Sequence, residues 1–317
     1  MDALSDVLRI VSLKGGVFLD AEFSEPWCIL SQIGPEDCRP FIPEATHILS
    51  YHYVVEGELQ VRVGDGAPVP LREGDIVVFP RNDAHCLGSA MEPHPVNAHE
   101  LLLPPLGGGL PRIVHGGGGR RTRLVCGYLG SDAQVSPLLE TLPRMLCLNV
   151  AGTSTGGWMV QTFNGAIQEV ARSEPGATTV ISKMAELLFV EAVRRYVATL
   201  PSEETGWLAG LRDPVVGRAL ALLHSQVARP WTAEDLARKV GLSRSAFADR
   251  FTALIGQPPM HYLASWRMHV AAHRLREGRA AIAQIAFDVG YESEAAFTRA
   301  FKRQFGAPPA SWRAQVG

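Results

Sequence analysis

Residues 236–259 have the sequence LARKVGLSRSAFADRFTALIGQPP, and residues 285–313 have IAFDVGYESEAAFTRAFKRQFGAPPASWR. Both begin with an aliphatic residue and Ala, and continue through Gly, Ser, two Phe residues four positions apart, a second Gly and a Pro pair. The intervals agree throughout, except that Gly and Ser are two residues apart in the first stretch and three apart in the second. This agreement predicts an internal repeat of about fifty residues.

Each copy of the repeat predicts a helix-turn-helix. The amphipathic segments 233–240 and 282–289 are each followed by a Gly, which can adopt the positive φ that ends a helix. Ser243 and Ser293 can then cap the next helix. In such motifs the second helix enters the major groove of DNA. An ordinary helical hairpin is the alternative for one copy, but two copies in register favour a DNA-binding domain.

The charge distribution along the 317 residues agrees with a DNA-binding C-terminus. The net charge is −2 and apolar residues make up 46% of the chain. Residues 214–317 contain 14 Lys and Arg against 7 Asp and Glu, a net charge of +7. Residues 1–213 contain 16 against 25, a net charge of −9. A basic part joined to an acidic one is typical of a DNA-binding domain carried by a domain that binds something else.

The sequence also predicts a cytoplasmic protein with no membrane partner. Its first residues are acidic where a signal peptide would be basic, and charged residues interrupt the apolar segment 183–200. The five cysteines are scattered, odd in number and without CxxC spacing. This pattern favours reduced thiols over a disulfide framework or a zinc finger.

The hydrophobic pattern before the repeat predicts an α+β protein with several domains. A short amphipathic helix over residues 1–10 precedes a strand-rich region that is typical of an antiparallel sandwich or barrel. The glycine runs 107–109 and 116–119 bracket a loop within this region and suggest a mobile surface segment. The clearest expected strands are 48–55, 59–63, 75–79 and 124–128. Two helices are expected after them, at 158–172 and 178–200.

The repeat resembles the AraC/XylS family of bacterial transcription regulators. The second copy carries the more specific match, Ile285-Ala286-x3-Gly290-Tyr291-x-Ser293-x3-Phe297-x-Arg299-x-Phe301-Lys302 followed by Phe305-Gly306-x-Pro308-Pro309-x2-Trp312-Arg313. The resemblance implies two helix-turn-helices joined by a long helix, here Pro259 to Glu277, about 28 Å long. Two helices held at that separation can enter successive major grooves, which recur every ~34 Å, if the DNA bends slightly.

The strand-rich part resembles the cupin-type sensor domain of many family members. The matching motifs are Gly74-Asp75-x4-Pro80-x-Asn82-x2-His85 and Tyr51-His52-x4-Gly57-Glu58. The resemblance therefore implies a cupin-like sensor domain at 1–135, a helical linker and dimerisation region at 136–213, and the DNA-binding domain at 214–317.

Comparison with the family's contact positions gives candidate DNA-binding residues in both repeats. In the first repeat, it implies that Ser245, Ala248 and Asp249 face bases. It also implies that Arg244 faces a phosphate. In the second, the matching positions are Glu294, Ala295, Ala296 and Arg299, with Lys302 placed to neutralise a phosphate. Arg299 can pair with guanine, and Glu294 can accept a hydrogen bond from cytosine.

His52 and His85 are the candidate effector-binding residues. Strand parity and the cupin motifs both place them in the barrel interior. Metal-binding cupins carry a His-x-His pair and a Glu, but these positions fall on Pro43, Ala45 and Ser50 here. A divalent metal such as Zn or Cu would need His47 as a third imidazole. No cofactor is therefore certain, and two histidines that line a ligand pocket are the favoured interpretation.

Two alternatives remain for the signal. Cys86 and Cys126 are candidate redox-active thiols, because a neighbouring imidazolium can lower a thiol pKa. A metal-dependent cupin enzyme fused to a DNA-binding domain is the remoter alternative. The favoured interpretation is a non-enzymatic transcription regulator that binds double-stranded DNA as a homodimer. It would respond to a small molecule and act as an activator that engages RNA polymerase.

Overall fold

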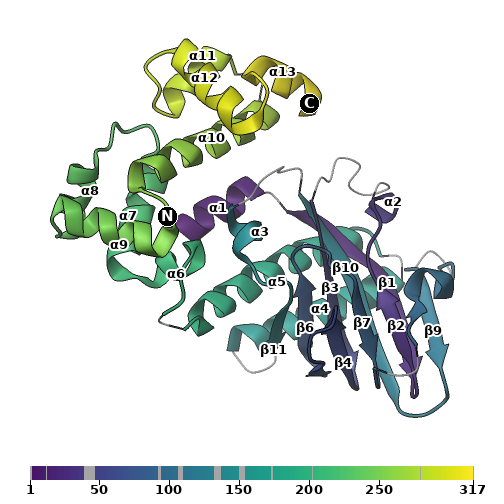
Figure 1. Cartoon of the computed structure of the whole chain (residues 1–317). Helices are drawn as coiled ribbons and strands as arrows, with labels where there is room; N and C mark the ends of the chain where they lie inside the picture. The colour runs from purple at the N-terminus through teal and green to yellow at the C-terminus, as the bar shows by residue number, and fades with distance from the viewer. Residues whose placement is uncertain are drawn as a thin grey trace. The chain divides into compact units, whose positions relative to one another are not determined.

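The computed structural model describes residues 2–11, 13–38, 47–91, 94–105, 110–131, 137–149, 154–172, 174–201, 203–278 and 280–316 (Figure 1). The chain forms two compact units. Ser12–Tyr196 is called the β unit, and Met1–Val11 together with Val197–Gly317 is called the helical unit.

Two packed sheets form the body of the β unit. Its strands are β1 (Lys14–Ser24), β2 (Cys28–Ser31), β3 (His47–Glu56), β4 (Glu58–Val63), β5 (Val69–Arg72), β6 (Asp75–Phe79), β7 (His85–Gly88), β8 (Val96–Asn97), β9 (Arg112–Gly116), β10 (Arg121–Ser131) and β11 (Leu146–Asn149). The six-stranded sheet has the order β11-β6-β3-β10-β1-β9, and the five-stranded sheet has the order β5-β4-β7-β2-β8. Most neighbours are antiparallel, so the expected sandwich is confirmed.

The interior of the sandwich follows from alternation along each strand. Ile29, Val61 and Leu87 of the five-stranded sheet are buried in one core with Val54 and Leu124 of the other sheet. Because side chains alternate with period two, the residues between them point to the opposite face. This parity decides which candidate site residues lie inside the sandwich.

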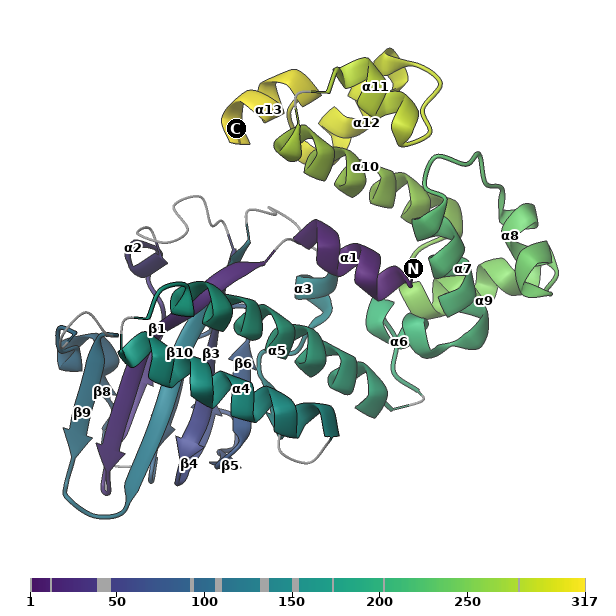
Figure 2. The same ribbon diagram turned by 180° about the vertical axis from the view of Figure 1, so that it is seen from behind.

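Helices complete the β unit. They are α2 (Pro35–Cys38), the 3-10 helix η1 (Ala98–Leu101), α3 (Pro137–Thr141), α4 (Ser154–Ala171) and α5 (Ala177–Thr199). The long helices α4 and α5 lie across the outer face of the six-stranded sheet (Figure 2). Phe163 of α4 contacts Tyr53 of β3 edge to face, with ring centroids 5.2 Å apart. The two long helices expected from the sequence are thus present and packed on this sheet.

The helical unit contains both copies of the repeat. Its helices are α1 (Ala3–Val11), α6 (Trp207–Arg212), α7 (Pro214–Ser225), α8 (Ala233–Val240), α9 (Arg244–Ile255), α10 (Pro259–Glu277), α11 (Ile282–Asp288), α12 (Glu294–Phe305) and α13 (Pro309–Val316). Helices α8 and α9 form the first helix-turn-helix, α11 and α12 form the second, and α10 has the bounds expected for the connecting helix. Phe247, Phe251, Phe297 and Phe301 are all fully buried, as the repeat predicted.

The caps of these helices follow the predicted chemistry. Ser243 and Ser293 accept hydrogen bonds from the backbone N–H groups of Ala246 and Ala296, at 3.2 and 3.3 Å. Gly241 ends α8 in the left-handed conformation, with φ of 78°. The local sequence therefore determines where each helix of the motif starts and stops.

The compact units divide the chain differently from the three functional domains expected from the sequence. Helix α1 packs against α7 and α10 of the helical unit rather than with the strands, and buries Val7 and Val11. Helix α6, expected in the linker, also belongs there, since the Trp207 indole N–H donates to the Tyr262 hydroxyl at 2.7 Å. The functional division into residues 1–135, 136–213 and 214–317 stays a prediction.

The glycine run 116–119 forms a tight turn between β9 and β10. Gly116 has φ of 135°, and a Cβ on it would lie 1.8 Å from the Ser24 carbonyl oxygen. The N–H groups of Gly117 and Gly119 donate to the carbonyls of Ser24 and Glu25, at 2.9 and 2.8 Å. Glycine is required here for close backbone packing, and the run lies at the surface as expected. Its mobility stays a prediction. The second run, residues 107–109, lies outside the described residues.

Candidate functional site

His52 and His85 meet in the interior of the sandwich. His52 is on β3 of one sheet and His85 begins β7 of the other, and both are almost fully buried. Their Nε2 atoms are 2.7 Å apart. Phe79 stacks on the His85 ring with centroids 3.6 Å apart. The expected approach of the two imidazoles is therefore observed, while their role in effector binding stays a prediction.

Cys126 is a third member of this cluster that sequence reasoning did not connect to it. The register of β10 on β3 places Cys126 directly opposite His52. Its Sγ atom lies 2.8 Å from His52 Nδ1. The two residues are 74 positions apart, and only the strand register brings them together.

The hydrogen-bond partners determine which atom donates and which accepts throughout the cluster. His85 Nδ1 lies 2.8 Å from the Asp83 carbonyl oxygen, which can only accept, so this nitrogen carries the proton. In a neutral ring His85 Nε2 is then the acceptor, and His52 Nε2–H donates to it. His52 Nδ1 in turn accepts from the Cys126 thiol. The four groups form one chain of donors that runs from Cys126 to the Asp83 carbonyl.

Burial keeps this chain electrically neutral. Burial lowers the pKa of His85 to about 4 and lowers the pKa of His52 well below its usual 6.5, with a further contribution from the neighbouring His85. Burial also raises the pKa of the Cys126 thiol far above its usual value. At neutral pH the cluster therefore consists of two neutral imidazoles and a protonated thiol.

A narrow cleft opens next to the cluster. His52 and Cys126 line it together with apolar side chains of both sheets, among them Leu19, Phe23, Ile29 and Ile113. Residues of η1 and its flank, including Ala98 and Leu102, close the outer side. The cleft thus joins the His52 cluster to the surface of the β unit.

The residues present do not fit a metal centre with three ligands. No three His, Cys, Asp or Glu side chains gather suitably within the described residues. His47 Nε2 lies 2.7 Å from the Pro80 carbonyl oxygen instead. Cys126 and His85 contact opposite nitrogens of the His52 ring, so they cannot share one ion with it in this arrangement. Pro43 and Ala45 lie outside the described residues.

The cysteines proposed as redox sensors lie on different faces of the sandwich. Cys86 follows the inward-facing His85 on β7, so it points to the outer face and is half-buried. Cys126 is buried within the cluster and protonated. Since the thiolate is the reactive form, this environment does not activate Cys126.

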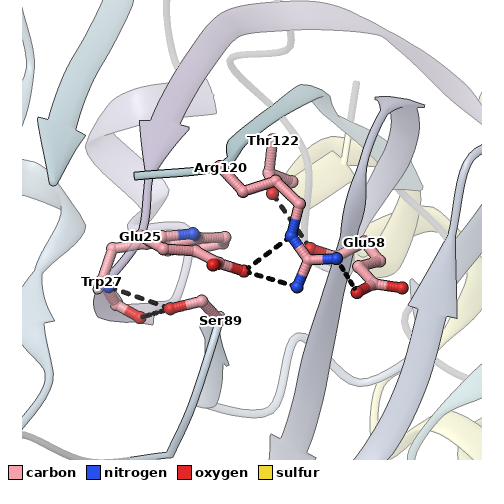
Figure 3. Close-up of polar contacts among 6 residues, drawn as sticks. All are labelled: Glu25, Trp27, Glu58, Ser89, Arg120 and Thr122. Carbon is pink, nitrogen blue, oxygen red and sulfur yellow. Dashed lines mark hydrogen bonds and ion pairs between the residues drawn. The ribbon is translucent and has the colours of Figure 1, made fainter. Parts of the chain in front are cut away.

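A second, polar hollow lies on the β unit beside β4 and β5, with a volume of about 600 Å³. Figure 3 shows the side chains at one end of it, where Arg120 lies between Glu25 and Glu58. Arg120 Nη2 and Nε donate to Glu25 Oε1 at 3.0 and 3.2 Å. Arg120 is well exposed, so these ion pairs contribute little to stability.

The candidate DNA contacts of the first motif lie at the start of α9. Arg244, Ser245 and Asp249 are exposed, and Ala248 is half-buried. The Ser243 cap fixes the N-terminus of this helix directly before them. Their position is that of residues that contact DNA in such motifs.

The candidate contacts of the second motif lie at the same place on α12. Glu294, Ala295, Arg299 and Lys302 are exposed, and Ala296 is half-buried. Within the described residues, no ion pair occupies Arg299 or Lys302. Both cations are thus available to an external anion such as DNA.

A joint around Arg267 of α10 connects the two motifs. Arg267 Nε and Nη2 donate to the carbonyls of Val227 and Arg229, which follow α7, at 3.0 and 2.8 Å. Gly290, in the turn of the second motif, approaches the same segment. A Cβ on Gly290 would lie 2.6 Å from the Ala228 carbonyl oxygen. The absence of a side chain at Gly290 therefore sets how closely the two lobes approach.

Comparison with known proteins agrees with both units. Residues 2–198 match the cupin family, and residues 236–315 match the helix-turn-helix domain family. A putative AraC-like transcription regulator of Streptomyces lividans is 34% identical over 99% of this chain and 98% of its own length. The regulator AlkR of Acinetobacter baylyi is 29% identical over 99% of this chain and 100% of its own length. The solved DNA-binding domain of AdpA, in complex with a target DNA, is 29% identical over 32% of this chain and 92% of its own, with a TM-score of 0.31.

The fold, the two family matches and the full-length relatives define a DNA-binding transcription regulator that carries a cupin unit. The chain belongs to the AraC-like family of transcription regulators. In the part of the chain that the structure describes, no helix is long and apolar enough to span a membrane.

Proposed function

We propose that this regulator changes its DNA binding when a small molecule occupies the cleft beside His52. The supporting observation is the neutral His52–His85–Cys126 cluster, buried at the base of a cleft in a cupin unit. The same chain carries two helix-turn-helix motifs. A ligand that binds one conformation better shifts the equilibrium toward it, which is how occupancy of the cleft would control the helical unit.

The proposed roles of the DNA-contacting residues follow from their exposure and chemistry. Arg299 and Glu294 would contact base edges, as would Ser245, Ala248 and Asp249 in the first motif. Arg244 and Lys302 would contact phosphates, which fix the register of a protein on DNA without specifying its sequence.

The proposal includes an assembly state and a mode of action. Two copies would associate through α5, act in the cytoplasm, and activate transcription by engaging RNA polymerase. Exposed apolar residues on one side of α5, Val180 and Leu187, support the choice of this helix. The cupin unit would sense rather than catalyse, in keeping with relatives that are named as transcription regulators.

A reporter gene under the regulator's own operator tests the sensing role. We expect His52→Gln to abolish the response to the inducer, because the imidazole lines the cleft, while basal DNA binding persists. Replacement of the four cysteines outside the cluster, Cys28, Cys38, Cys86 and Cys147, by Ser or Ala should preserve the response. Retention of the response by His52→Gln, together with its loss in a stable chain without these four cysteines, would indicate a redox sensor instead. The folding of both variants is checked by circular dichroism.

A further inference from the structure

We infer that the cleft beside His52 binds an uncharged, largely apolar small molecule beneath the η1 segment. The inference names the ligand class of the sensing site and so rests on the proposed function. It follows from three properties of the cleft, which are the charge of its lining, the state of its polar groups and the structure of its outer wall.

The lining of the cleft carries no fixed charge among the described residues. Its side chains include no Asp, Glu, Lys or Arg. His99, at the outer edge, lies 3.6 Å from the Asp37 carboxylate, which would balance its charge when protonated. A charged ligand would lose its hydration and find no compensating charge in the lining, which disfavours its binding. The cleft therefore discriminates against carboxylates and ammonium ions.

The principal polar groups of the lining already have protein partners. Both nitrogens of His52 are hydrogen-bonded, to His85 and to Cys126. The side-chain Nε2 of Gln32 donates to the backbone carbonyl of Asn82. The backbone carbonyl of Gln32 accepts a hydrogen bond from His99 Nε2. A ligand thus gains more from apolar contact with side chains such as Leu19 and Ile113 than from new hydrogen bonds.

The outer wall of the cleft is suited to local opening. The interior volume is about 30 Å³ in this structure, room for little more than a water molecule, so a ligand must displace the wall. None of the four residues of η1 is buried. The segment is held by the two-residue strand β8, by the paired hydrogen bonds between Leu103 and Arg112, at 2.7 and 3.0 Å, and by the half-buried Ala98 and Leu101, which pack on the core. Because none of its residues is fully buried, the segment has a lower free energy of local opening than the strands of the core.

Calorimetric titration of the full chain with three probes of equal length tests the ligand class. The probes are 1-octanol, octanoate and octylammonium, each kept below its aggregation limit. We expect 1-octanol to bind, and both ions to bind at least about tenfold more weakly because their charge is not compensated. Equal or tighter binding of either ion, or no binding of 1-octanol, would overturn the inference.

Two exposed leucines provide a matched pair of variants. Leu102 and Leu30 are similarly exposed, at 39% and 38%, but of the two only Leu102 lines the cleft. We expect Leu102→Arg to weaken 1-octanol binding and to favour octanoate, since it places a guanidinium at the cleft. Leu30→Arg should leave both affinities within about twofold of the wild-type values. The inference fails if Arg120→Ala alters 1-octanol binding and Leu102→Arg does not, because the ligand would then occupy the polar hollow.

DNA affinity, measured in the presence of each probe, distinguishes the inferred ligand class from the proposed sensing function. Binding of 1-octanol with the expected preference but no effect on DNA affinity would support the ligand class and contradict the proposed sensing function. Binding of octanoate that changes DNA affinity would contradict the ligand class and support the sensing function.

Discussion

At the scale of single residues, Arg299 and Lys302 of α12 are exposed cations on the same helix with different expected roles. Arg299 lies in the second turn of α12, on the part of the helix whose side chains can reach base edges, whereas Lys302 lies about one turn further along. This difference separates sequence recognition from electrostatic attraction.

We expect Arg299→Ala to cost ~1–3 kcal/mol on the preferred site and to relax specificity at one base pair. Lys302→Ala should weaken binding to all sequences about equally and reduce the salt dependence, because one phosphate contact is lost. Selection from random duplexes, followed by titration at several salt concentrations, measures both effects. An unchanged selected sequence at unchanged affinity for Arg299→Ala would refute its assignment to a base.

Four buried histidines predict a loss of stability in mild acid. Burial lowers the pKa of His85 and His269 to about 4 and of His224 to about 3, and lowers that of His52 as well. The unfolded chain binds protons near pH 6.5 and the native chain does not. The free energy of unfolding should therefore fall as the pH decreases from about 6.5 to about 4.

Urea unfolding at about pH 7.5 and about pH 5 measures this loss. Each shift from 6.5 to about 4 corresponds to roughly 3 kcal/mol at its full extent. His85→Gln should reduce the pH dependence, because it removes one such group. His94→Gln, at an exposed position, should not. A midpoint that stays constant between the two pH values would contradict the prediction.

At the scale of structural elements, Gly241 and Gly290 occupy equivalent turns of the two motifs. Both have positive φ, 78° and 85°, so an L side chain is strained at either position. A Cβ on Gly241 meets nothing within 4 Å, whereas one on Gly290 collides with the Ala228 carbonyl. Substitution of Gly241 therefore tests backbone strain alone, whereas substitution of Gly290 tests the same strain together with the packing between the two lobes.

We expect Gly241→Ala to cost roughly 1–2 kcal/mol of stability with little effect on DNA affinity per folded molecule. Gly290→Ala should cost more, and should also lower DNA affinity, because it forces the second lobe away from the segment after α7. Thermal unfolding and DNA titration provide the two readouts. Similar losses of stability in both variants, with full DNA affinity, would show that the joint does not set the spacing of α9 and α12.

At the scale of the whole molecule, the proposed dimer depends on the exposed side of α5. Leu188 and Val193 of the apolar segment 183–200 are buried within the unit, and Val190 is half-buried. Leu187 is 40% exposed and shares its side of the helix with Val180, seven residues away. This exposed apolar side of α5 is where a second copy would pack.

We expect Leu187→Asp to yield a folded monomer, because a charge buried in the dimer interface would cost several kcal/mol. Thr179→Asp adds the same charge at an exposed polar position of α5 and should remain dimeric. Light scattering at micromolar concentration measures the mass of each variant. A monomeric wild-type chain would remove the proposal, and a dimeric Leu187→Asp would place the interface elsewhere.

The sequence alone determined the features that depend on neighbouring residues. The repeat predicted both helix-turn-helices, since caps such as Ser243 and turns such as Gly241 act within a few residues of their helix. The α+β class, the sandwich and the connecting helix were also predicted correctly. The interior position of His52 and His85 was predicted from strand parity together with the resemblance to the cupin motifs.

Only the tertiary structure decided the features that depend on residues far apart in the chain. Cys126 joins His52 through the register of β10 on β3, and a shift by one residue would turn it to the other face. The packing of α1 in the helical unit and the contact of Gly290 with Ala228 depend on which surfaces meet. Hydrophobic periodicity marks a buried face but does not specify its partner. For that reason the cleft, the joint and the neutral histidine pair emerged only from the fold.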